Sequence, residues 1–160
     1  MGEKEISFRL RVYESVNELT AADKNLLKAA QNALGSAYAP YSKFRVAAAL
    51  LLNDGRIVTG TNQENASFPA GICAEGTALS AASAVYPGEA VIKIAITIKN
   101  ENRVISQPVA PCGICRQRLL EYENRFNNSI EVIMAGEDGP VYIVPTVKDL
   151  LPLHFSGSVL

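Results

Sequence analysis

Apolar and polar side chains alternate near the start of the chain. Every second residue is apolar over one stretch: Ile6, Phe8, Leu10 and Val12. A period of two is typical of a strand with one buried face. The pattern therefore predicts a short extra strand within residues 5–14.

The pattern changes to helical spacing after residue 20. Thr20 is a suitable N-cap, and Asp23 follows three residues later as an acidic partner. Apolar residues then recur at intervals of three and four: Leu26, Leu27, Ala30, Ala33 and Leu34. Gly35 is typical of a helix end. We therefore predict a first helix between residues 20 and 35.

A continuous apolar run occupies residues 46–52, which is typical of a strand buried on both faces. It is followed by Asn53-Asp54-Gly55, a strong turn signal, because Asp-Gly tolerates the positive φ of a tight turn. Residues 56–61 are predicted to resume as the second strand. The two strands are predicted to pair antiparallel as a hairpin.

The remaining chain alternates between helical and strand patterns. Small apolar residues predict a helix from residue 73 that ends before Pro87-Gly88, and a second helical pattern covers residues 116–126. Further strands are predicted at 91–98, 130–135 and 141–144, a loop at 99–107, and a short capped helix at 146–150. No linker or repeat interrupts this order, so we expect one α/β domain over residues 1–160, with residues 1–19 as an N-terminal extension and a roughly five-stranded mixed sheet.

Composition and charge narrow the class of protein. With 160 residues, 48% of them hydrophobic, the chain can bury one good core. Its longest apolar run is far below the ~20 residues of a membrane span, and its charged N-terminus does not resemble a secretory signal. We expect a cytoplasmic protein without membrane partners. A net charge of −1 and a pI near 5.9 favour small substrates over nucleic acid.

All three cysteines lie in two motifs, Cys73-Ala74-Glu75 and Pro111-Cys112-Gly113-Ile114-Cys115. Cytosolic thiols stay reduced, so an odd count with a Cys-x-x-Cys points to metal binding. Three soft ligands with an open fourth position, beside a carboxylate that can move protons, indicate hydrolytic chemistry at zinc. Both motifs stand where a loop enters a predicted helix, whose amides would favour thiolates.

Other interpretations exist for each residue. A Cys-x-x-Cys can be incidental or redox-active, and a structural zinc would use four protein ligands, for which no fourth cysteine is available. The single histidine, His154, is expected to be a surface or packing residue. Glu75 alone would be an ordinary residue at a helix start.

Four segments resemble one family closely: APYSKFRV at 39–46, GTNQENA at 60–66, GICAEGTA at 71–78 and APCGICRQ at 110–117. Together they resemble the small homotetrameric cytidine deaminases of nucleoside salvage, in unbroken order from about residue 20 to 155. The resemblance implies a three-layer α/β/α fold with helices on both faces of the sheet. It also implies hydrolysis of cytidine and deoxycytidine to uridine and deoxyuridine with release of ammonia.

The resemblance assigns roles to the chemical centre. Cys73, Cys112 and Cys115 would hold Zn²⁺. Glu75 would take a proton from water, deliver it to N3 of the pyrimidine and then pass a proton to the departing amine, while the hydroxide attacks C4. An alternative with the same centre is a deaminase of another aminopyrimidine nucleoside, such as a blasticidin-type antibiotic.

Substrate positions follow from the same resemblance. Asn62 and Glu64 would hold the ribose hydroxyls, which argues for a ribose-containing substrate. The backbone of Ala74 would contact the base, and Phe44 would pack against it. Phe68 would stand near the ribose, where many members have Tyr, so that a hydroxyl is lost there.

Two further expectations concern the assembly and the metal charge. Phe155 would reach the pocket of a neighbouring subunit in a homotetramer. Many members have Arg directly after the catalytic Glu, where it offsets the thiolate charge, but this chain has Gly76. The first hypothesis is that Arg116 or the two helix dipoles replace it.

Overall fold

The computed structural model describes residues 1–157. Within them lie three helices, α1 (Ala21–Ala33), α2 (Ala74–Val85) and α3 (Gly113–Phe126). The strands of the same region are β1 (Arg11–Tyr13), β2 (Phe44–Leu52), β3 (Ile57–Thr61), β4 (Val91–Asn100), β5 (Glu131–Ala135) and β6 (Val141–Val144).

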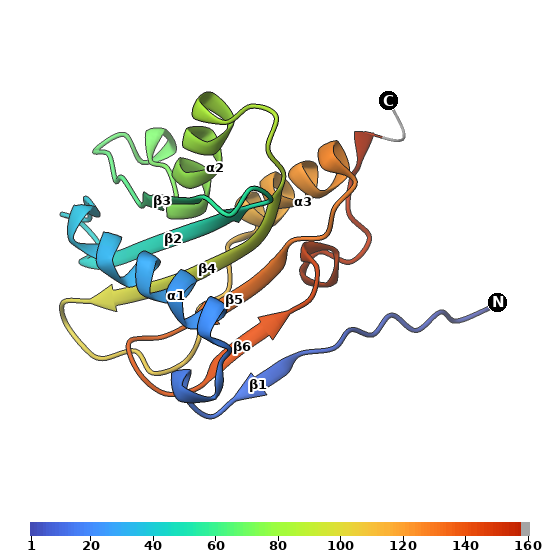
Figure 1. Cartoon of the computed structure of the whole chain (residues 1–160), viewed down its shortest axis with the longest axis horizontal. Coiled ribbons are helices and arrows are strands. Elements are labelled where there is room, and N and C mark those ends of the chain that lie inside the picture. The colour runs from blue at the N-terminus through green and yellow to red at the C-terminus, as the bar shows by residue number, and fades with distance from the viewer. Residues whose placement is uncertain (158–160) are drawn as a thin grey trace.

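The strands form one mixed sheet in the order β1-β6-β5-β4-β2-β3 (Figure 1). β4 and β5 are parallel, and every other neighbouring pair is antiparallel. The predicted hairpin is confirmed, with Gly55 at a φ of 87° in the turn between β2 and β3. The mixed sheet is also confirmed, and it has six strands because the N-terminal extension adds β1 at one edge.

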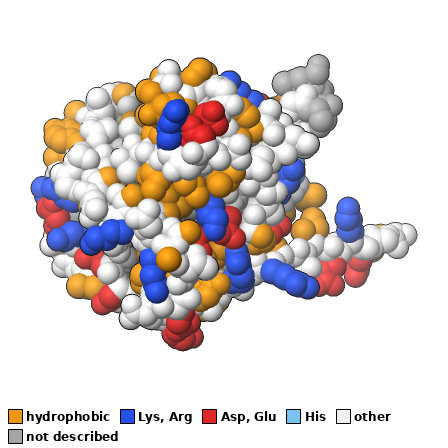
Figure 2. Space-filling view, viewed as in Figure 1, with side chains coloured by type: hydrophobic (Ala, Val, Ile, Leu, Met, Phe, Trp, Pro, Cys, Tyr) orange, Lys and Arg blue, Asp and Glu red, His pale blue; other side chains and the backbone are white. Residues whose placement is uncertain are grey.

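That added strand is shorter than the alternation predicts. Only Arg11–Tyr13 pairs with β6, and residues 1–10 have no regular secondary structure. β6 is four residues long and offers no partner to the earlier part of the extension. Ile6, Phe8 and Leu10 are therefore exposed, and Figure 2 shows the segment projecting from the body of the molecule.

The helices cover both faces of the sheet, as the resemblance implies (Figure 1). α1 packs against one face through Leu26, Leu27 and Ala30. α2 and α3 pack against the other, where Leu79 and Leu119 join the larger core. β2 supplies residues to both cores, which explains its continuous apolar run. None of the helices within residues 1–157 is long and apolar enough to span a bilayer.

Element ends differ from the sequence prediction at several places, and β2 begins at Phe44 rather than at residue 46. Residues 99 and 100, predicted as loop, extend β4 because they pair with Arg45 and Phe44 of β2. α3 begins at Gly113 rather than 116. The short element after Thr146 is a 3₁₀ turn over Val147–Leu150, and Thr146 caps it as expected.

The start of α1 is fastened to the sheet by an ionic network. Thr20 Oγ1 accepts a hydrogen bond from the Asp23 amide at 3.2 Å and donates one to Asp23 Oδ2 at 2.6 Å. Asp23 is 5% exposed, and Lys93 Nζ of β4 lies 2.7 Å from its Oδ1. Lys93 also pairs with Glu131 of β5 at 2.8 Å. Burial by itself would raise the pKa of Asp23, but hydrogen bonds from Lys93 and Thr20 lower it overall.

The contact between α2 and β3 depends on a glycine. A Cβ at Gly60 would stand 2.6 Å from the carbonyl oxygen of Ala74 and 2.8 Å from the Cα of Ala78. Both atoms belong to the backbone of α2, which cannot move aside as a flexible side chain could. Gly60 therefore lets α2, the helix capped by Cys73, lie directly on β3.

Asp23→Asn should lower the free energy of unfolding by about 1.5–3 kcal/mol at pH 7, because the Lys93 hydrogen bond loses its charged acceptor. Since the pKa of Asp23 is lowered in the folded state, its contribution is present above the ordinary carboxyl pKa and lost as pH falls through the folded value. Urea unfolding at several pH values measures this. Asp54→Asn, a surface control, should change stability by less than about 0.5 kcal/mol. Equal effects of both variants at pH 7 would contradict the network's role.

Gly60→Ala should destabilise the protein by about 3 kcal/mol, because the new methyl group meets backbone that cannot repack. Gly35→Ala is the matched control, since a Cβ there meets nothing within 4 Å. It should change the free energy of unfolding by less than about 1 kcal/mol. Denaturant titration compares the two, and similar values would show that α2 can shift on the sheet.

Candidate active site

The fold brings the three cysteines together at the start of two helices. Their sulfur atoms all lie within 4.8 Å of one another, and Sγ of Cys73 is 3.8 Å from Sγ of Cys112. Zinc bound to tetrahedral thiolates at about 2.3 Å would place its sulfurs about 3.8 Å apart. The soft donor set and this spacing fit zinc, with three protein ligands and room for a fourth.

Each motif stands at a helix N-terminus, as predicted. Cys73 is the N-cap of α2, Cys112 is the N-cap of α3, and Cys115 lies in the first turn of α3. Neither N-cap side chain bonds its own helix, so both thiols can turn toward a shared ligand. The unpaired amides and the helix dipoles place partial positive charge beside the sulfurs.

The thiols are already coupled to one another. A hydrogen bond from the Cys115 thiol lowers the pKa of Cys73 to about 6, and the same bond raises the pKa of Cys115. The positive charge of Arg118 also favours the Cys73 thiolate. Cys73 therefore favours the thiolate form, which is the form that binds a metal.

Glu75 lies beside the cluster in the first turn of α2 and is only 4% exposed. Burial raises its pKa, while its own backbone amide and the Cys115 thiol act in the opposite direction. A cavity of about 210 Å³ is lined by Glu75 together with Cys73, Ala74, Cys112 and Phe44. A buried carboxyl group whose pKa is raised toward neutrality is suited to proton transfer.

A wider, more open hollow of about 580 Å³ adjoins this cavity, and the two share Asn62 and Cys73. Glu64 and Phe68 line the hollow, so the predicted ribose positions lie next to the chemical centre. Phe68 is 76% exposed and meets the Tyr41 ring edge-on, with centroids 5.9 Å apart. The outer hollow therefore carries the polar groups of Asn62 and Glu64, and the inner cavity carries the buried Glu75.

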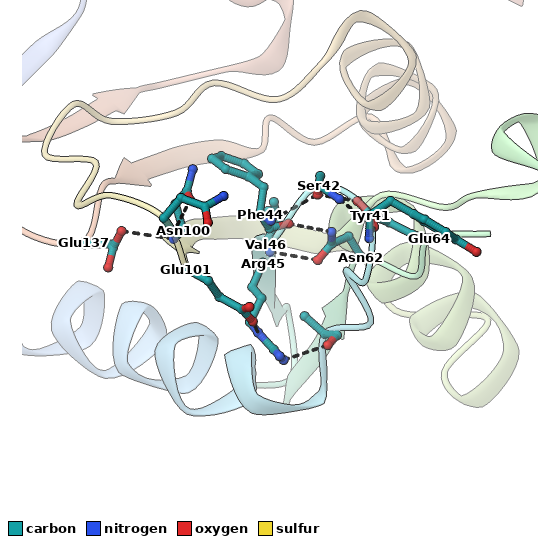
Figure 3. A network of polar contacts seen from close by, with 12 residues as sticks. Tyr41, Ser42, Phe44, Arg45, Val46, Asn62, Glu64, Asn100, Glu101 and Glu137 are labelled. Carbon is teal, nitrogen blue, oxygen red and sulfur yellow. Dashed lines mark hydrogen bonds and ion pairs between the residues drawn. The ribbon is translucent and has the colours of Figure 1, made fainter. Parts of the chain in front are cut away.

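Asn62 holds the start of β2 by both ends of its amide (Figure 3). Its Oδ1 accepts from the Val46 amide at 2.8 Å, and its Nδ2 donates to the Phe44 carbonyl oxygen at 2.9 Å. Each end still has capacity for one more hydrogen bond. Asn62 is therefore a rigid polar group on the wall that both cavities share.

Glu64 holds the loop before β2 in the same network (Figure 3). Its carboxylate accepts from the Tyr41 amide at 3.0 Å, from the Ser42 amide at 3.3 Å and from the Ser42 hydroxyl. Burial alone would raise the pKa of Glu64, but these hydrogen bonds lower it. The carboxylate is fixed in its charged form at the edge of the hollow.

Phe155, which the resemblance assigns to the pocket of a neighbouring subunit, lies outside both cavities of its own chain. Phe155 is 61% exposed, and its carbonyl oxygen accepts from Nε2 of Gln117 at 3.0 Å. His154 is exposed, as expected, and its Nδ1 lies 3.2 Å from the Leu151 carbonyl oxygen. The sequence reasoning missed Tyr41 as a residue of the hollow, although it stands within the quoted segment 39–46.

Comparison with known proteins agrees with this site. The family model described as the cytidine and deoxycytidylate deaminase zinc-binding region matches residues 20–127, which include all three cysteines. A cytidine deaminase of Halalkalibacterium halodurans is 38% identical over 133 residues, 83% of this chain and 93% of that protein. A probable cytidine deaminase of Dictyostelium discoideum is 39% identical over 135 residues, 84% of each chain.

Solved structures give the same result. The crystal structure of a cytidine deaminase from Burkholderia pseudomallei has a TM-score of 0.72 at 41% identity, covering 86% of this chain and 100% of that one. The cytidine deaminase structure from Mycobacterium leprae has a TM-score of 0.63 at 33% identity, covering 84% and 99%. The chain therefore belongs to the family of cytidine and deoxycytidylate deaminases.

Proposed function

We propose that this protein is a single-domain, zinc-dependent deaminase that converts cytidine and deoxycytidine, with water, to uridine and deoxyuridine and ammonia. One observation carries the proposal most strongly. The buried Glu75 lies beside a three-cysteine cluster in a cavity that adjoins a hollow lined by Asn62 and Glu64. The 38–41% identity to cytidine deaminases supports the choice of substrate.

Cys73, Cys112 and Cys115 would hold the metal ion. When bound, zinc supplies Lewis-acid activation of water at neutral pH. Three ligands from the protein leave one position for that water, which a four-ligand structural site would not. The starts of α2 and α3 position all three cysteines.

Glu75 would carry the proton through the reaction. It removes a proton from the attacking water as the oxygen adds to C4 and delivers that proton to N3 of the base. It then transfers the second proton to the leaving amino group, so that ammonia departs and the C4 carbonyl forms. Both tasks need a group that exchanges protons near neutral pH, and burial of Glu75 moves its pKa in that direction.

The walls of the two cavities would bind the nucleoside. Phe44 and the Ala74 backbone line the inner cavity, where the flat base would pack. Asn62 and Glu64 line the outer hollow and have acceptors and donors for ribose hydroxyls. Phe68 would add apolar contact at the ribose end without a hydroxyl of its own.

A homotetramer in the cytoplasm would complete this site, with Phe155 entering the pocket of a neighbouring copy. The chain's large exposed apolar side chains support an assembly: Phe68 at 76%, Ile114 at 67%, Leu153 at 89% and Phe155 at 61%. Ile114 lies between two of the cysteines. The acidic pI supports a free nucleoside rather than a nucleic acid as partner.

Glu75→Gln should reduce kcat for cytidine by a factor of about 10²–10⁴ while the zinc content stays complete, because the proton carrier is lost and the thiols are intact. The loss of cytidine absorbance and metal analysis of the same sample measure both. Glu121→Gln, on the exposed side of α3, should keep normal turnover. Normal turnover in fully zinc-loaded Glu75→Gln would refute the role given to Glu75.

Phe155→Ala should lower deaminase activity, and mixing this variant with Glu75→Gln chains should restore part of that activity. If Phe155 enters a neighbour's site, mixing Phe155→Ala with Glu75→Gln chains creates hybrid sites with both residues intact. The mixture should then exceed the summed activities of the two variants. Leu153→Ala is the matched control for the tail. The same mixture would show only the sum of its parts if Phe155 acted within its own chain or not at all.

A further inference from the structure

The metal site has a charge imbalance, given the zinc site of the proposed function. Three thiolates around Zn²⁺ leave a net charge of −1, and an ionised Glu75 close by adds a second negative charge. Excess negative charge makes a zinc-coordinated water less acidic and makes the thiolates costly to keep. The site therefore needs positive charge from a neighbouring part of the chain.

Arg116 is the cation nearest in sequence, but it has another task. Its Nε donates to the Pro111 carbonyl oxygen at 2.8 Å, and its Nη1 donates to the Leu150 carbonyl oxygen at 2.8 Å. These bonds brace the loop before Cys112 against the 3₁₀ turn that ends at Leu150. The guanidinium is thus directed at backbone carbonyl groups on the side of the C-terminal segment.

Gly76 and Arg118 occupy equivalent places on the two metal-binding helices. Gly76 follows Cys73 by three residues on α2, and Arg118 follows Cys115 by three residues on α3. In a helix this spacing puts each residue about one turn above its cysteine on the same face. The two positions are therefore set to meet where α2 and α3 come together.

The structure shows that they do meet. Nη1 of Arg118 fills the volume that a Cβ at position 76 would occupy, and its Cζ lies 3.5 Å from that point. Gly76 is buried, and the Arg118 guanidinium lies over it in the space that a side chain at this position would take. Among residues 1–157 the Arg118 side chain forms no hydrogen bond or ion pair that would commit its charge elsewhere.

We propose that Arg118 is the charge-balancing residue of the metal site, and that Gly76 is required because the guanidinium reaches the site across it. Arg118 lines neither cavity and acts through the thiolates, so it is a positioning residue and not a catalytic one. An arginine side chain at 76 and the observed position of Arg118 exclude each other, so the two positions form a coupled pair. In this chain the positive charge comes from Arg118 of α3, which lies over Gly76 of α2.

Arg118→Gln should lower zinc affinity by about tenfold or more, the usual effect of removing a partner of a metal ligand. Arg118→Lys should retain most of the affinity, because it keeps the charge. Arg125→Gln removes an arginine from the same helix far from the cysteines and should leave affinity unchanged. Competition with a chromophoric chelator measures zinc affinity, and the absorption bands of the cobalt-substituted protein report the thiolate environment.

Gly76→Ala separates this role from a general effect of charge. The added methyl group removes no charge but displaces the guanidinium, so zinc affinity should fall in the wild-type background. In the Arg118→Gln background the same change should have little further effect, because the two residues act as one unit. The paired variant Gly76→Arg with Arg118→Ala should regain affinity, since it returns the guanidinium from the α2 side.

Wild-type zinc affinity and an unchanged cobalt spectrum in Arg118→Gln would overturn the proposal. So would additive losses in the Gly76→Ala and Arg118→Gln double variant. Both readouts are independent of turnover. A protein that binds zinc with the expected dependence on Arg118 but does not deaminate cytidine would overturn the proposed function alone.

Discussion

Close packing of α2 on β3 is the constraint on which the site depends. Gly60 removes the one side chain that would hold the helix away from the sheet, and Ala74 and Ala78 face it. The N-terminus of α2 is thereby held next to that of α3 on the same face of the sheet. The thiols of Cys73 and Cys112, 39 residues apart in the chain, can then converge. A hydrogen bond at 2.9 Å from the Tyr122 hydroxyl of α3 to the Leu79 carbonyl oxygen of α2 joins the two helices as well.

The thiolates and Glu75 concentrate negative charge at the two helix starts. Helix amides and arginine side chains supply the positive charge around them. The amides of the first helical turns contribute partial positive charge at the same helix starts that carry the cysteines. Arg116 holds the loop that delivers Cys112, while Arg118 brings its charge over Gly76. These two arginines of α3 thus have different roles: Arg116 holds a loop in place, and Arg118 supplies positive charge.

The polar groups of the outer hollow are held in place by hydrogen bonds. Asn62 and Glu64 tie the loop before β2 to the strand end after β3, and the same groups face the hollow. Their polar atoms are already oriented by backbone partners, so little side-chain freedom remains to be lost on binding. The inner cavity is formed largely by apolar side chains and the start of α2.

The sequence alone determined the features whose physics is local. The Thr20 cap, the turn at Gly55 and the cysteine motifs at helix starts depend on nearby residues, and the structure has all three. The length of β1 was decided by β6, whose four residues pair with only part of the alternating segment. The meeting of Gly76 and Arg118 was decided by tertiary packing as well. A glycine has no side chain to signal a contact, and an exposed arginine on a helix reads as solvated until a second helix is placed against it.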